Sequence, residues 1–142
     1  MKYIDTNVFI YAIENHDMYG KPCKKILNDI QDKNLDSCAS MLVLVESINV
    51  LAKINKELKK TNQKTLIIGA NLNAILSLPI TWFELDFLTI RKAAEYSHNI
   101  ATQDYFHLAT MDIQSVHEII SADKELDKVH SIKRIDPLNY KS

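Results

Sequence analysis

Apolar and polar residues alternate along this chain with two different periods, which predict helices and strands in turn. Residues 19–31 place Cys23, Ile26, Leu27 and Ile30 at spacings of i, i+3, i+4 and i+7, as expected for a helix with one buried face. Short β-prone runs separate such segments. The pattern predicts strands at 2–4, 36–39, 80–85, 118–122 and 132–135, and helices at 8–13, 19–31, 41–52, 64–77, 86–99 and 102–112.

The segment 41–52 differs from the other predicted helices because it is apolar nearly all round. Ser40 is a suitable N-cap for it, and Glu46 is its one acidic residue. A helix with no polar face is expected in a protein interior. We therefore predict that this helix is deeply buried.

Strands and helices alternate in the predicted order, and this indicates the fold class. Such a pattern is typical of an α/β fold in which helices cover both faces of a parallel sheet. With 142 residues the chain fits a single domain, 1–142. Folds of this class bind ligands beyond the carboxyl ends of the strands, where the strand order reverses. Asp5 and Asp123 each follow a predicted strand directly and are candidates for such a crevice.

Composition narrows the class of protein further. Only two Gly and three Pro occur, so long flexible linkers are not expected. Cys23 and Cys38 cannot build a disulfide framework and fit as small buried hydrophobes in a reducing compartment. The first residues lack a secretory signal, and no apolar run approaches the roughly 18 to 20 residues that cross a bilayer. We expect a cytoplasmic protein without membrane contact.

The net charge of −1 arises from 17 basic and 18 acidic residues, which are unevenly distributed. Between Arg91 and Lys124 the only basic residue is Lys92, while five lysines lie within 53–64. This lysine run is typical of a solvated helix face, and contact with RNA phosphates is its second interpretation. If metal neutralised four carboxylates, the remaining net charge would be positive, which is compatible with a polyanionic partner.

Glu46 is the most informative single residue, because it lies among apolar neighbours in the helix predicted at 41–52. An ionised carboxylate in such surroundings is strongly unfavourable unless something compensates it. A buried salt bridge with a lysine is one compensation, and a bound metal ion is another. Both remain open for Glu46 taken alone.

Asp5, Asp104 and Asp123 also have ordinary interpretations. Asp at a strand-to-helix junction is a good N-cap, and Asp104 suits the first turn of a helix. The case for a site depends on the whole set, because carboxylates brought together without cations repel and raise their pKa values. A divalent cation resolves that repulsion, and magnesium prefers oxygen ligands.

Other kinds of site have weaker support. The five histidines show no metal-binding spacing, and His107 is interpreted as a satisfied, partly buried side chain. No glycine-rich phosphate loop or G-x-S-x-G nucleophile elbow occurs. Tyr11, Tyr19, Tyr105 and Phe106 lie close in sequence to the carboxylates and are candidates for stacking on bases, although core packing is the ordinary role of such residues.

Four segments, in order along the chain, resemble the characteristic motifs of PIN domains: 5–8, 43–48, 104–110 and 119–124. Asp5 opens the first motif directly after a strand, Glu46 lies in an apolar helix, and Asp104 and Asp123 belong to the third and fourth. Leu126 stands where the family usually has an aromatic residue, and 55–80 matches nothing specific. The chain length is similar to that of VapC-type toxins of toxin–antitoxin pairs.

The resemblance implies a three-layer α/β/α PIN-like fold with a central parallel sheet of about five strands and an acidic pocket at their carboxyl ends. It implies a metal-dependent endoribonuclease. A homodimer and a cognate antitoxin, whose tail covers the pocket, are also implied. The implied metal ligands are Asp5, Glu46, Asp104 and Asp123, which would bind Mg²⁺ or Mn²⁺, with Asp127 as a further candidate and Thr6, Asn7 and Ser121 orienting them.

Other functions stay as alternatives to RNA cleavage. A catalytically silent PIN-like module that binds RNA or protein predicts damaged carboxylates, whereas all four are present. A receiver-like domain needs paired acids after the first strand, and a haloacid-dehalogenase-type phosphatase needs an acid at position 7, where Asn7 stands. A flap-nuclease-like domain that cuts DNA is the closest enzymatic alternative, but such domains are generally longer and more acidic.

Overall fold

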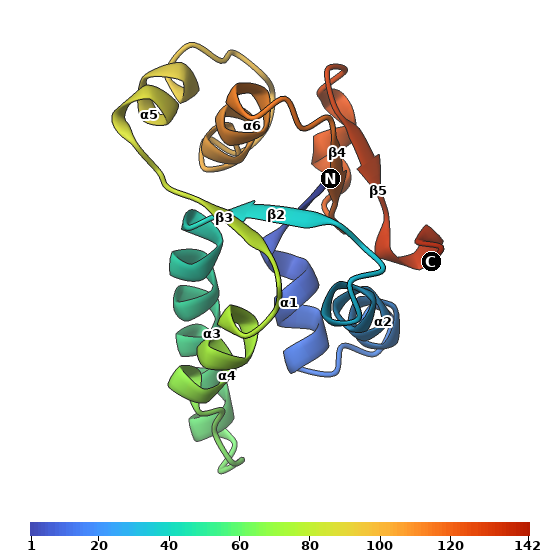
Figure 1. The fold of residues 1–142 in the computed structure, drawn as a ribbon. Coiled ribbons are helices and arrows are strands. Elements are labelled where there is room, and N and C mark those ends of the chain that lie inside the picture. Colours follow the sequence, from blue (N-terminus) through green and yellow to red (C-terminus); the bar gives the residue numbers. More distant parts are fainter.

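The computed structural model describes residues 1–142 and contains one sheet of five strands in the order β3-β2-β1-β4-β5. Every neighbouring pair is parallel, and Figure 1 shows the helices that surround the sheet. The five predicted strands are therefore confirmed. Their bounds are β1 (Lys2–Ile4), β2 (Ser37–Ser40), β3 (Thr81–Phe83), β4 (Glu118–Ile120) and β5 (Lys133–Ile135).

Helices make all the connections between these strands, so the predicted alternation is also confirmed. Between β4 and β5 the connection is only a short 3-10 helix, η1 (Lys124–Lys128), and a second one, η2 (Pro137–Asn139), follows β5. The α-helices are α1 (Thr6–Ile13), α2 (Gly20–Gln31), α3 (Leu42–Lys60), α4 (Ile68–Leu76), α5 (Phe87–Ala93) and α6 (Asp104–Ile113).

Two helices are shorter than the sequence pattern predicts, because tertiary hydrogen bonds hold the adjoining backbone out of helical conformation. The side chain of Asn55 bonds both the N–H and the carbonyl of Leu66, which precedes α4. The Tyr105 hydroxyl bonds the N–H and the carbonyl of His98 beyond the end of α5. The predicted helices 64–77 and 86–99 are therefore wrong at these ends.

The sheet separates two apolar cores, because successive residues of a strand point to opposite faces. On one face Ile4, Ala39 and Ile120 pack beneath α1, α2, α3 and α4. On the other face Tyr3, Cys38 and Ile119 pack with residues of α6 and η1, and α5 packs against α6. Helices thus cover both faces (Figure 1), and the three-layer α/β/α arrangement is confirmed.

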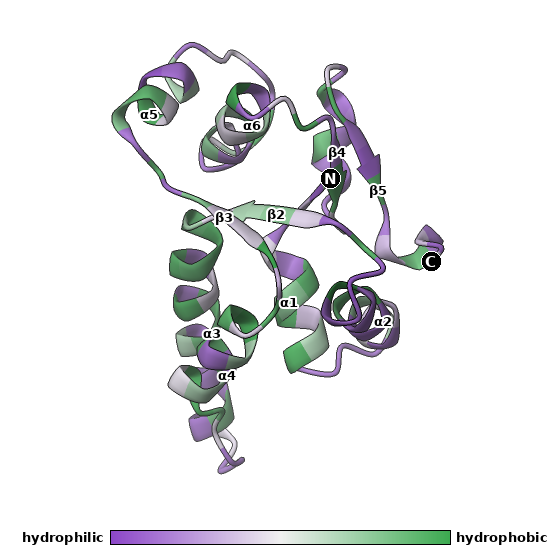
Figure 2. Ribbon diagram, viewed as in Figure 1, coloured by the Kyte–Doolittle hydropathy of each residue, from purple (hydrophilic) through white to green (hydrophobic).

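The prediction that the helix at 41–52 is deeply buried is wrong. Helix α3 buries Val43, Ser47 and Leu51, whereas Val45 and Ile48 on another face are exposed. The turns of α3 next to the sheet are nevertheless strongly hydrophobic in Figure 2. Helical periodicity identifies the apolar positions, but which of them find a neighbour depends on where the other helices pack.

The strand order places two junctions side by side. The chain runs from β1 outward to β2 and β3, then crosses to β4 on the other side of β1. The carboxyl ends of β1 and β4 therefore meet where the strand order reverses, which is the usual ligand-binding crevice in such sheets.

Cys23 and Cys38 are buried free thiols, as expected. No helix is both long and apolar enough to cross a membrane.

Candidate functional site

A pocket of about 310 Å³ opens at this junction, and its walls come from several elements. The four predicted carboxylates all line it, although they are far apart in the sequence. Asp5 follows β1, Glu46 belongs to α3, Asp104 begins α6 and Asp123 follows β4. The other lining residues are Thr6, Asn7, Ile10, Tyr11 and Val50.

Asp5 is buried and caps α1, so its ordinary interpretation also holds. Its Oδ1 accepts a hydrogen bond from the Thr6 N–H at 2.8 Å. Its Oδ2 accepts from the Ser121 hydroxyl at 2.6 Å and from Asn7 Nδ2 at 3.4 Å. Both oxygens are thus oriented by donors, which fixes the carboxylate at the end of β1.

Ser121 and Asn7 join the junction after β1 to the junction after β4. Asn7 Nδ2 donates to Ser121 Oγ at 3.1 Å, and Asn7 Oδ1 accepts from the Ala122 N–H at 3.1 Å. Ser121 Oγ also accepts from the Asp123 N–H at 3.0 Å. Asp123 Oδ1 in turn caps η1 by accepting from the Glu125 N–H. The loops that carry Asp5 and Asp123 are thereby held together.

Glu46 is compensated by polar neighbours, and no lysine pairs with it. Its Oε1 lies 2.6 Å from Nε2 of His107 and accepts from the Thr6 hydroxyl at 2.8 Å. Its Oε2 accepts from Gln103 Nε2 at 2.7 Å. The lysine salt bridge considered from the sequence is therefore wrong, and a histidine takes its place.

His107 is fully buried, more so than the sequence suggested, and its role was missed there. The only signal was its position three residues after Asp104, one helical turn along α6. Burial by itself lowers the pKa of His107, but the bond to Glu46 and the charges of Asp5, Glu46 and Asp104 raise it overall. His107 thus places a buried hydrogen-bonding partner for Glu46 behind the pocket.

The pKa values of two carboxylates in the pocket, Glu46 and Asp104, are shifted in opposite directions. Burial raises the pKa of Glu46, but hydrogen bonds from His107, Thr6 and Gln103 outweigh this and lower it. The pKa of Asp104 is raised from 3.8 to about 6, first by burial and then by the charge of Asp5, with smaller contributions from Asp123 and Glu46. Asp104 therefore experiences uncompensated negative charge.

This donor set fits a hydrated divalent cation. No three acidic or histidine side chains converge tightly enough to enclose an ion by themselves, so the carboxylates surround the pocket without forming a closed cage. Mg²⁺ usually keeps several waters and takes only one or two carboxylates directly. Burial is the largest cause of the raised pKa of Asp104, and the charges of nearby carboxylates, which a divalent cation would offset, raise it further.

Asp127 lies apart from the pocket. Its two oxygens accept from Arg134 Nε at 2.8 Å and Nη2 at 3.0 Å, in a bidentate ion pair. The guanidinium also bonds Asp136 and the carbonyl of Ser121. This arrangement gives Asp127 a structural partner and makes it a weaker candidate ligand than the other four.

The aromatic residues near the carboxylates differ in their surroundings. Tyr11 lines the pocket and stacks on Tyr19 with ring centroids 5.3 Å apart. Tyr105 uses its hydroxyl to hold the backbone of His98, which is a structural role. Among these tyrosines Tyr11 is therefore the one that lies at the pocket wall.

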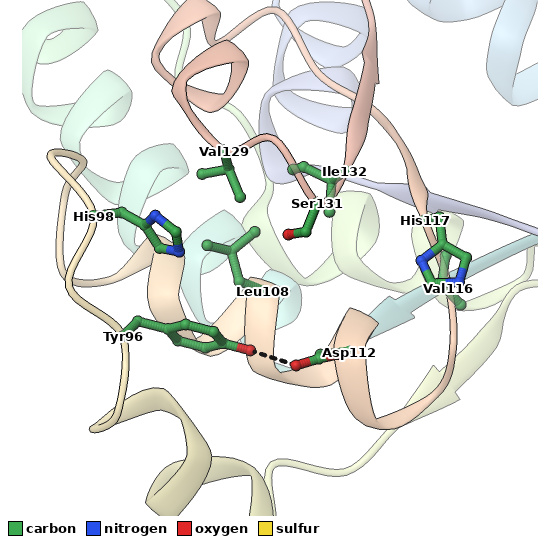
Figure 3. A pocket seen from close by; sticks show the side chains of 9 residues that line it. All are labelled: Tyr96, His98, Leu108, Asp112, Val116, His117, Val129, Ser131 and Ile132. Atoms are coloured by element: carbon green, nitrogen blue, oxygen red, sulfur yellow. Dashed lines mark hydrogen bonds between the residues drawn. The ribbon is translucent and has the colours of Figure 1, made fainter.

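A second, smaller cavity of about 100 Å³ lies beside α6 at the opposite edge of the sheet, near the amino ends of β4 and β5. Figure 3 shows Tyr96 bonded to Asp112, with His98 and His117 on either side of the apolar side chains. None of the predicted site residues lines it. The cavity contains no comparable cluster of carboxylates.

Comparisons with solved structures find proteins of similar fold. A Klebsiella pneumoniae structure described as a toxin–antitoxin complex is 14% identical, with a TM-score of 0.61 over 96% of this chain and 98% of that one. VapBC2 from Rickettsia felis, bound to a promoter DNA fragment, is 16% identical, with a TM-score of 0.66 over 95% and 98%. FitAcB from Neisseria gonorrhoeae is 16% identical, with a TM-score of 0.61 over 99% and 100%. These likenesses establish the fold.

A search of curated proteins finds no significant match. The PIN domain family, however, matches residues 2–131, which is nearly the whole chain. That range includes all four carboxylates of the pocket and the residues that orient them. The chain belongs to the PIN-domain family.

Proposed function

We propose that this protein is a divalent-metal-dependent endoribonuclease and the toxin of a toxin–antitoxin pair. The observation that carries the proposal is the pocket lined by Asp5, Glu46, Asp104 and Asp123, which come from four separate elements. Membership of the PIN-domain family supports a nuclease. Mg²⁺ is the proposed ion, with Mn²⁺ as its substitute.

In the proposed reaction the protein's own residues bind the metal ion and orient its ligands. A bound divalent ion would activate water and stabilise negative charge during phosphodiester hydrolysis. Asp5, Glu46, Asp104 and Asp123 would hold it, directly or through water. Ser121 and Asn7 keep Asp5 fixed, and Thr6 bonds Glu46. No side-chain nucleophile is required.

RNA would approach by its phosphate backbone. The lysines of the 53–64 run are exposed, four of them on the carboxyl-terminal half of α3, which also carries Glu46. They are suited to phosphate contacts of the kind that weaken as salt increases. Tyr11 at the pocket wall is suited to stack on an unpaired base.

Cleavage of total cellular RNA by the purified protein tests this proposal. Reactions would contain Mg²⁺, Mn²⁺ or EDTA, and they would compare the wild type with Asp5→Asn and Asp123→Asn. Asp112→Asn is a matched control, because it changes an exposed carboxylate outside the pocket. Discrete metal-dependent cleavage, retained by the control and lost in both pocket variants, is the expected result.

The main alternative is a catalytically silent module that binds RNA or protein. It predicts that the wild type retains RNA on a filter without cutting it under any metal condition. It also predicts that Mn²⁺ does not raise the melting temperature. This combination would reject the nuclease in favour of the binding module.

The toxin assignment is supported by the structures that this chain resembles, one described as a toxin–antitoxin complex and another as VapBC2. An RNA target and an antitoxin partner imply action in the cytoplasm. Expression of the wild type, but not of Asp5→Asn, should arrest bacterial growth. Co-expression of a cognate antitoxin should restore growth, and growth unaffected by the wild type would contradict the assignment.

A homodimer is supported by exposed apolar side chains near one edge of the sheet. Val45 and Ile48 lie on α3, which follows β2, and Phe87 and Leu88 lie on α5, which follows the neighbouring β3. Phe87 is 87% exposed, which is unusual for a large apolar residue.

Light scattering coupled to size-exclusion chromatography tests the dimer. Val45→Glu and Phe87→Glu should give monomers where the wild type gives dimers, because they introduce charge into an apolar contact. Ile67→Glu is the matched control, since Ile67 is equally apolar and exposed but precedes α4. A monomeric wild type, or dimers in all variants, would contradict this interface.

A further inference from the structure

A buried chain of hydrogen bonds connects the core of the sheet to the acidic pocket. Tyr3 lies on β1 and is completely buried. Its hydroxyl lies 2.5 Å from His107 Nδ1, and His107 Nε2 lies 2.6 Å from Glu46 Oε1. The Tyr3 and His107 rings meet edge to face with centroids 5.5 Å apart. Three elements, β1, α6 and α3, thus contribute one residue each.

The donors in this series of hydrogen bonds determine which atom donates and which accepts at each step. The Ser40 N–H can only donate, and it donates to the Tyr3 oxygen at 3.1 Å. The Tyr3 hydroxyl can still donate its own proton, because a hydroxyl oxygen donates one hydrogen bond and accepts others. The acceptor in reach of that proton is His107 Nδ1. The ring proton must then be on Nε2, which points it at the Glu46 carboxylate.

The two carboxylate oxygens of Glu46 therefore accept different numbers of hydrogen bonds. Oε1 accepts two bonds, from His107 and from the Thr6 hydroxyl. Oε2 accepts one, from Gln103, whose side chain is exposed. Oε1 is therefore the anchored oxygen, and Oε2 keeps more of its lone-pair capacity free for a ligand in the pocket.

We propose that Tyr3 and His107 are positioning residues that lock Glu46 by its Oε1 and present Oε2 to the divalent cation. This inference rests on the proposed function, because it assigns Glu46 to the metal. Outer partners of this kind typically change metal affinity 10- to 100-fold when they are removed. A purely structural pair would affect stability and leave metal affinity unchanged.

The test measures Mn²⁺ affinity by titration calorimetry in three variants of the chain. His107→Leu removes the donor, and we expect binding about tenfold weaker or worse. His107→Gln retains an N–H that can reach Glu46 and should recover most of the affinity. Tyr3→Phe keeps the packing of the ring and removes only the hydroxyl, so it should weaken binding by a smaller factor even if His107→Leu fails to fold.

Tyr96→Phe is the matched control, because it removes a tyrosine hydroxyl bonded to Asp112 outside the pocket. Its Mn²⁺ affinity should equal that of the wild type. Wild-type affinity in both Tyr3→Phe and a folded His107→Leu would overturn the proposal, as would a wild type that binds no Mn²⁺.

Nitrogen NMR of the His107 ring gives a second readout that needs neither RNA nor metal. The wild type should carry its proton on Nε2 with Nδ1 unprotonated, and Tyr3→Phe should lose that strict preference. A proton on Nδ1 in the wild type would overturn the proposal. If Mn²⁺ binds as expected but RNA is not cut, the nuclease assignment fails while the positioning role stands.

Discussion

Asp104 provides a direct test of the electrostatics of the pocket. Its negative charge should lower the stability of the metal-free protein, whereas the proposed function needs that charge to bind the metal. Its carboxylate is half-buried and feels the charges of Asp5, Asp123 and Glu46. Replacing it with Asn keeps the shape and removes one charge. Without metal, Asp104→Asn should therefore be more stable than the wild type at neutral pH.

The magnitude follows from the pKa of Asp104, which is raised from 3.8 to about 6. Such a difference corresponds to about 3 kcal/mol against the charged form. Solvent screening reduces this in a partly open side chain, so we expect about 1 to 1.5 kcal/mol in the free energy of unfolding. For a chain of this size that is an increase of about 3 to 6 °C in melting temperature.

The pH dependence has a definite sign. Between pH 3.8 and about 6 the folded state holds the Asp104 proton more tightly than the unfolded state does, so this group's contribution to stability falls as pH rises. The advantage of Asp104→Asn should therefore be fully developed above pH 6. It should shrink as the pH is lowered toward 4, where the wild-type carboxyl is protonated as well.

Urea denaturation in EDTA at pH 7.5 and pH 5 measures both quantities. Asp112→Asn serves as the control, because that exposed carboxylate pairs with Lys92 and its loss should change stability by less than about 1 kcal/mol. Saturating Mn²⁺ should reverse the order and favour the wild type. An Asp104→Asn protein no more stable than the wild type at pH 7.5, or equally favoured at both pH values, would refute this reasoning.

Three further predictions concern the core, an ion pair and the metal. Ile26→Ala should lower the free energy of unfolding by about 2 to 5 kcal/mol in urea denaturation, because Ile26 is fully buried on the inner face of α2; a loss below about 1 kcal/mol would contradict that packing. Arg134→Ala should lower the free energy of unfolding by about 2 to 3 kcal/mol, because it removes a half-buried bonding partner of two carboxylates. Asp127→Ala, by contrast, should leave the Mn²⁺ affinity measured by calorimetry unchanged. Mn²⁺ at about a hundred times its Kd should stabilise the wild type by about 2.7 kcal/mol, and a thermal scan should show no such gain for Asp5→Asn.

The sequence by itself determined the elements and the junctions that carry the site. Hydrophobic periodicity is a local property, and it predicted the five strands, the parallel sheet and most helices. It also placed Asp5 and Asp123 directly after strands, where their N-cap roles could be anticipated. The ends of α4 and α5 were not predictable in this way, because side chains of Asn55 and Tyr105 fix them from elsewhere in the fold.

Only the tertiary structure decided what each carboxylate meets. The sequence left a lysine and a metal ion open as partners of Glu46, and the fold supplies His107, which belongs to another helix and is itself bonded to Tyr3 of the central strand. Burial and hydrogen bonding between residues distant in sequence depend on how layers pack, and periodicity carries no information about pairing. For the same reason α3 could be recognised as apolar, while its exposed face, with Val45 at 54% exposure, became visible only once the other helices were in place.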